Sequence, residues 1–105
     1  MRNLSIFGLL MAVAVADSVP SLAADVNHGE QVAQRWCVSC HLVTASQIQT
    51  TTGAPPFATI AGKPDFDVNR LTSFLLEPYP RMPNMSLTRE EAADIAAYIG
   101  SLRKQ

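Results

Sequence analysis

The sequence has no large charge imbalance and very little cysteine. Eight basic and nine acidic residues give a formal net charge of −1, without the basic excess expected of a nucleic-acid-binding domain. Two cysteines are too few for a disulfide-rich scaffold, and there are no internal repeats or low-complexity tracts. A chain that is 48% hydrophobic and 16% charged is not intrinsically disordered by composition. Its 105 residues amount to one domain at most.

Long apolar runs are also missing, and the N-terminus holds only a short one. The uncharged apolar run 4–16 has 13 residues, whereas a transmembrane helix needs about 20. Arg2 precedes this run, and Ser21-Leu22-Ala23 fits the small-x-small rule for cleavage. These features predict a secretory signal peptide that is cleaved after Ala23, or one residue later. They argue against a retained membrane anchor.

Cleavage after Ala23 predicts two parts, a signal peptide over residues 1–23 and a single domain over residues 24–105. After cleavage we expect the domain to have no stable membrane insertion and to be exported to the bacterial periplasm or a similar compartment. Domains not much larger than about 40 residues are marginal without extra support. We therefore expect an additional source of core.

A first helix is predicted to begin near Asn27, because Asn27 and Glu30 have the spacing of a capping box. It is expected to continue to about Cys40. Residues 42–61 lack a helical period and contain adjacent prolines, which predicts a long structured loop. Such a long loop in a compact domain is expected to have a functional role.

Two further helices are predicted in the second half of the chain. One starts near Asp65 or Asp67 and is stopped by Pro78. The last has Thr88 as N-cap and Glu91 at the third helical position. The apolar stripe of the last helix consists of Ala92, Ile95, Ala96, Ile99 and Leu102.

Both cysteines lie in the motif Cys37-Val-Ser-Cys40-His41. Side chains three residues apart lie on one side of a helix, so each thiol can add to one vinyl group of a haem. His41 then projects toward the iron as an axial ligand. This motif is the attachment signature of c-type haem, and the predicted export agrees with it.

Three other interpretations explain fewer features of the motif. A structural disulfide is compatible with export but leaves His41 without a role. A thioredoxin-like redox pair requires a βαβ context, which the sequence lacks. A zinc site requires four ligands, and only His28 and carboxylates remain to complete one.

The chain resembles a small class I bacterial c-type cytochrome with one haem. The matching parts, in order, are Gly29 in the first helix, the motif at 37–41, the proline-bearing loop 53–57, and the methionine loop with terminal helix at 81–99. The resemblance implies an all-α class I cytochrome c fold, with three to five helices wrapped around one covalently bound haem c. The porphyrin would supply the additional core.

The resemblance also implies the iron ligands, His41 and a methionine. It favours Met82, which stands in a Met-Pro step, while Met85 in the same loop stays open. A thioether is a neutral, soft ligand, and His/Met ligation raises the reduction potential of a haem relative to ligation by two histidines. A ligating histidine usually donates its other ring N–H to a carbonyl, and the resemblance places that carbonyl at Pro55, with Pro56 as the alternative.

Other residues receive structural roles. His28 is expected at the surface, and Gly29 and Tyr98 are expected where the first and last helices cross. Five apolar residues are expected to line the haem pocket: Phe57, Ile60, Phe74, Leu75 and Leu87.

If His41 and Met82 fill both axial positions, the iron has no open site for a substrate. The sequence then predicts a monomeric, non-enzymatic, periplasmic one-electron carrier. Its partners would be redox proteins such as a dehydrogenase, an oxidase or another cytochrome. One alternative is a dedicated haem subunit of a dehydrogenase or oxidase complex. A second is a gas-binding haem protein with a labile methionine.

Overall fold

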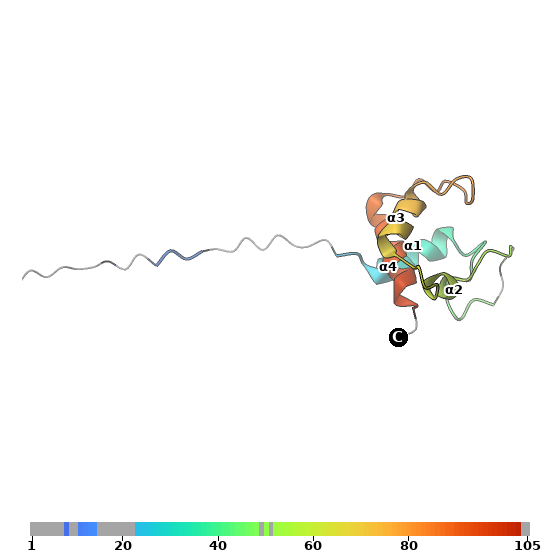
Figure 1. Ribbon diagram of the computed structural model, residues 1–105, viewed down its shortest axis with the longest axis horizontal. Coiled ribbons are helices and arrows are strands. Elements are labelled where there is room, and N and C mark those ends of the chain that lie inside the picture. The colour runs from blue at the N-terminus through green and yellow to red at the C-terminus, as the bar shows by residue number, and fades with distance from the viewer. Residues whose placement is uncertain (1–7, 9–10, 15–22, 49, 51, 104–105) are drawn as a thin grey trace, which may run out of the picture.

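The computed structural model describes residues 8, 11–14, 23–48, 50 and 52–103 (Figure 1). Over these residues the chain forms α-helices and no β-strand, as the all-α prediction requires. The helices are α1 (Val26–Trp36), α2 (Phe57–Ala61), α3 (Val68–Leu76) and α4 (Arg89–Ser101). Most of the predicted signal peptide lies outside the described residues. Within the described part, no helix combines the length and apolarity that crossing a membrane would need.

Helix α1 differs from its prediction at both ends. Its N-cap is Asp25, whose side chain accepts a hydrogen bond from the His28 backbone N–H at 3.0 Å. The prediction of Asn27 as the cap is wrong, because Asn27 already lies within the first turn. The helix ends at Trp36, where the chain tightens into a turn and the backbone N–H groups of Cys40 and His41 both donate to Cys37 O.

The stretch 42–61 is not a loop throughout, since its last five residues form α2. Pro56 precedes this helix with a φ of −57°, which is compatible with the ring and with helix entry. A helix of five residues is too short to show an apolar period, so the sequence pattern could not reveal it.

The other two helix starts agree with the sequence. Asp67, not Asp65, caps α3, and its side chain accepts from the Arg70 backbone N–H at 2.8 Å. Thr88 and Glu91 form the predicted capping box of α4, with both reciprocal hydrogen bonds present.

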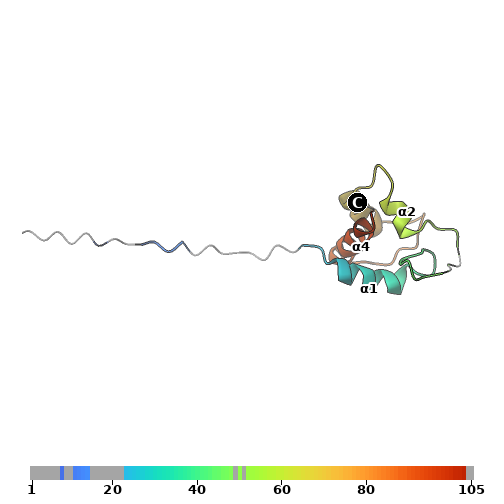
Figure 2. The same cartoon turned by 90° about the horizontal axis from the view of Figure 1, so that it is seen from below.

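Helices α1 and α4 cross in close contact, and α3 packs on α4 (Figures 1 and 2). Gly29 lies at the crossing, as predicted. A Cβ atom at Gly29 would come within 2.9 Å of Ile95 N and closer still to the carbonyl of Asp94. Only glycine allows the two backbones to approach this closely.

The buried core is made mostly from α1 and α4. Four of the five residues predicted for the stripe of α4 are buried, and Leu102 is partly buried at the C-cap. The buried residues that form the hydrophobic core are Val32, Ala33, Cys37, Val43, Phe57, Ala61, Leu75, Ala92, Ile95, Ala96, Tyr98 and Ile99.

A polar contact beside the helix crossing was not predicted. Asp94 of α4 is buried, and its Oδ1 accepts from the Asp25 backbone N–H at 2.7 Å. Its Oδ2 lies 2.6 Å from His28 Nδ1. The side chain of His28 is 43% exposed, so His28 is at the surface, as expected, but is also paired. The hydrogen bond to Asp94 raises the pKa of His28.

Candidate functional site

The motif at 37–41 follows directly on the last residue of α1. The turn closed on Cys37 O brings Cys37, Cys40 and His41 into one short segment. Both thiols are free; Cys37 is buried and Cys40 is half-buried. The two sulfurs are therefore available for bonds to a group outside the chain.

Cys37 does not have the electrostatics of a redox-active thiol. Burial, followed by the nearby Cys40, raises the pKa of the Cys37 thiol to about 11. Thiol-disulfide enzymes instead lower the pKa of their attacking cysteine to obtain a thiolate near neutral pH. This difference argues against the thioredoxin-like interpretation.

The ring of His41 is held at one nitrogen. Nδ1 lies 2.6 Å from the carbonyl oxygen of Pro55, and not of Pro56. A carbonyl only accepts, so in the neutral ring Nδ1 carries the proton and Nε2 has the lone pair that a metal requires. The ring also packs against Phe57, with centroids 5.3 Å apart. His41 is thus oriented with its uncommitted nitrogen available as a ligand.

Gln47, which is not among the predicted site residues, makes several hydrogen bonds to the backbone around the motif. Its Nε2 donates to Val38 O and to His41 O, each at 2.9 Å. Its Oε1 accepts from the Val43 backbone N–H at 2.9 Å. A glutamine in a loop has no periodic or motif signal, so only the folded backbone reveals this role.

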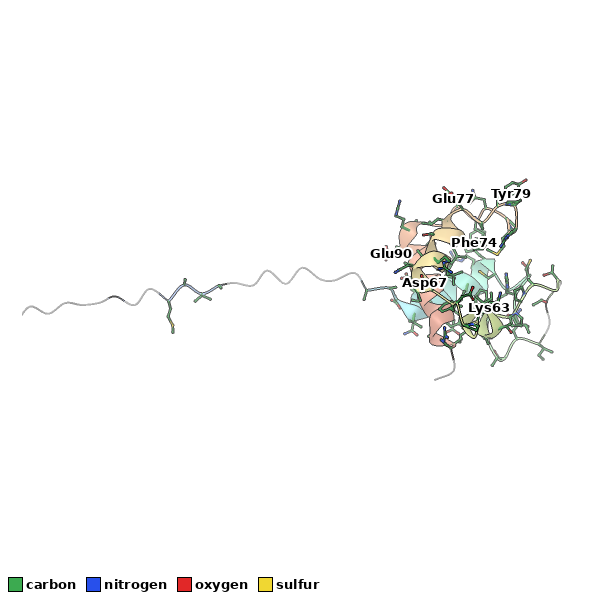
Figure 3. All side chains as sticks on the ribbon, in the orientation of Figure 1. Lys63, Asp67, Phe74, Glu77, Tyr79 and Glu90 are labelled. Atoms are coloured by element: carbon green, nitrogen blue, oxygen red, sulfur yellow. The ribbon has the colours of Figure 1, made fainter. Side chains whose placement is uncertain are left out.

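Of the two candidate methionines, Met82 is the one that belongs to the residues packed against the buried core. Both are half-buried in the segment between α3 and α4. Met82 packs against the buried core, and its backbone N–H donates to Pro78 O at 3.2 Å. Tyr79 lies at the outer tip of the same segment and is 78% exposed (Figure 3).

The residues predicted to line a haem pocket belong to the apolar interior or its edge. Phe57 and Leu75 are buried, and Ile60 and Leu87 pack against the core. Phe74, labelled on α3 in Figure 3, is half-buried. Tyr98 connects this region to the motif, because its hydroxyl donates to Val43 O at 2.6 Å and its ring lies edge-on to Phe57.

This donor set fits haem c. Two free thiols stand three residues apart, a histidine presents an uncommitted Nε2, and a thioether lies on a segment that packs against the same core. Cys37, Cys40 and His41 would hold the haem and its iron, with Met82 as the expected second axial ligand and Pro55 orienting His41.

Comparisons with known proteins agree with these observations. The sequence model of the family described as cytochrome c oxidase, cbb3-type, subunit III matches residues 24–99. The chain is also 50% identical over 102 residues to cytochrome c-552 of Bradyrhizobium diazoefficiens, an alignment that covers 96% of this chain and 98% of that protein. No solved structure matches the chain.

Proposed function

Since the chain belongs to the c-type cytochromes, which bind haem c through cysteines and carry electrons, we propose that it is a periplasmic one-electron shuttle. The haem is attached through Cys37 and Cys40, and His41 and Met82 are the axial ligands. The observation that carries this proposal is the contact of His41 Nδ1 with Pro55 O, which leaves Nε2 for the iron.

Cys37, Cys40, His41 and Met82 would hold the haem and keep its iron closed to substrates. Cys37 and Cys40 would provide its covalent thioether attachment, which needs no oxidant because a thiol adds to a vinyl group without net oxidation. A bound haem supplies a reversible change of iron oxidation state. His41 and Met82 together would leave no open coordination position on the iron, and therefore no catalytic residue is proposed.

The similarity to cytochrome c-552 of Bradyrhizobium diazoefficiens, which extends over 98% of that protein, supports a small c-type electron carrier. Net charge of −1 provides no strong field for steering toward partners of one sign. Docking would therefore depend on local contacts with larger redox proteins.

The second candidate function is a dedicated haem subunit of a periplasmic oxidase or dehydrogenase complex. The description of the matching family as an oxidase subunit favours this candidate. Export is part of both candidates. The short apolar run and the small-x-small site support it, and the family match begins at residue 24, where the mature domain is predicted to start.

The test is purification of the haem-loaded protein from its native periplasm, followed by an equilibrium redox titration. A shuttle is recovered as a single chain, titrates reversibly with one electron, and does not bind carbon monoxide when reduced. Recovery only with larger catalytic subunits would establish the dedicated subunit. Ready carbon monoxide binding would instead favour the gas-binding alternative.

A further inference from the structure

Gln47 joins three backbone groups around the haem-attachment motif. Its amide nitrogen donates to the carbonyls of Val38 and His41, and its amide oxygen accepts from the N–H of Val43. Val38 lies between the two cysteines, and Val43 follows the histidine by two residues. One side chain therefore holds the main chain before and after His41.

The carbonyls of this segment are satisfied largely by groups from outside it. Thr52 Oγ1 donates to Cys40 O at 3.0 Å, and the Phe57 backbone N–H donates to Leu42 O at 2.9 Å. These contacts replace the helical hydrogen bonds that would have formed had α1 continued. The backbone conformation at the motif is consequently set by the local turn on Cys37 O together with these contacts from the following loop, and Gln47 makes the one at the His41 carbonyl.

We propose that Gln47 is a positioning residue for the His41 imidazole. Gln47 fixes the backbone from which the ring projects, while Pro55 O fixes the ring at Nδ1. Two anchors, one on the main chain and one on the ring, then define the direction of Nε2. This inference rests on the proposed function, because it concerns the orientation of a haem ligand.

The principal test is Gln47→Met in the haem-loaded protein. Methionine has a similar length but no donor, so the contacts to Val38 O and His41 O are lost. The readouts are the reduction potential and the paramagnetically shifted proton NMR signals of His41 and the haem in the ferric state. We expect both the potential and the NMR signals to shift. The intact mass should show that the haem is still covalently attached.

Two control variants separate positioning from general stability. Thr44→Val removes a hydroxyl in the same loop that contacts Ser46 Oγ at 3.0 Å. Thr88→Ala removes the N-cap of α4 and lowers stability without removing any hydrogen bond to the motif. Both are expected to keep the NMR pattern and the potential of the wild-type protein.

Gln47→Glu provides a second, independent variant. It keeps an acceptor for the Val43 N–H but has no donor when ionised. The shifted NMR pattern should therefore appear at high pH and return partly toward wild type at low pH, where the carboxyl regains one O–H.

The proposal is overturned if either variant keeps the wild-type NMR signals and potential across the pH range. It is also overturned if neither variant can be loaded with haem, because Gln47 would then be required for folding and not for ligand orientation. Failure of the proposed function is a separate result, seen as wild-type protein that carries no haem.

Discussion

At the scale of residues, Asp94 is the buried carboxylate that anchors the start of α1 to α4. A buried charge is costly unless it is hydrogen-bonded. Asp94 meets this requirement through the Asp25 backbone N–H and His28 Nδ1. Because these contacts connect the two helices at the point where they cross, the protonation of His28 is coupled to folding.

This coupling predicts a pH-dependent stability. The pKa of His28 is raised above its ordinary 6.5 by the hydrogen bond to Asp94. A histidine whose pKa is higher in the folded than in the unfolded protein stabilises the fold. This stabilisation is complete at pH values below the unfolded-state pKa and is lost as the pH rises through the folded-state pKa. The free energy of unfolding lost in His28→Gln should therefore be largest below pH 6.5 and shrink above it.

Urea denaturation of wild type and His28→Gln at a series of pH values checks this prediction. Gln34→Ala, on the exposed side of α1, is the matched control and should show no pH-dependent difference. A difference between wild type and His28→Gln that stays constant with pH would contradict the role assigned to the His28–Asp94 pair.

The choice of axial methionine is also tested at this scale. Met82 packs against the core, and a thioether held in place can serve as a neutral iron ligand. We expect Met82→Ala to lose the thioether-to-iron charge-transfer band and to bind carbon monoxide when reduced. Met85→Ala should retain the band, and the opposite pattern would assign the ligand to Met85.

At the scale of elements, the crossing of α1 and α4 depends on the missing side chain of Gly29. An added Cβ would overlap backbone atoms of Asp94 and Ile95. These atoms cannot move aside as a flexible side chain could. We expect Gly29→Ala to lower the free energy of unfolding by about 2 kcal/mol or more, since overpacking costs ~1–3 kcal/mol.

Gly53→Ala is the control for this substitution, because nothing lies within 4 Å of its added Cβ. Thermal or urea denaturation of the two variants gives the comparison. Equal stability of Gly29→Ala and Gly53→Ala would mean that the helices do not cross as closely as described.

The elements show what local sequence can and cannot predict. The capping box of Thr88 and Glu91 is a contact three residues apart, so the sequence contained the whole signal. The spacing of Asn27 and Glu30 gave the wrong cap for α1, because Asp25 caps the helix through the His28 N–H and its own backbone N–H is held by Asp94 of α4. The site shows the same limit. The motif at 37–41 could be recognised directly, whereas the hydrogen bonds of Gln47 depend on the folded loop.

At the scale of the whole molecule, a small helical core includes Cys37, while Cys40 and His41 lie half-buried at its edge. Tyr98 of α4 reaches Val43 across 55 positions of sequence and holds this part of the chain against the core. Such contacts could not be predicted from the sequence, because they form only when the ends of the domain come together. A covalently attached haem would add a large apolar body to this core.

We propose above all that Cys37 and Cys40 carry one haem on an exported, processed chain. The most direct test is the intact mass of the protein purified from a periplasm that contains haem-attachment machinery. We expect the mass of the chain from Ala24, or from Asp25, plus one haem. A mass without haem, with the two cysteines joined in a disulfide, would contradict this proposal and make the chain a thiol or disulfide protein.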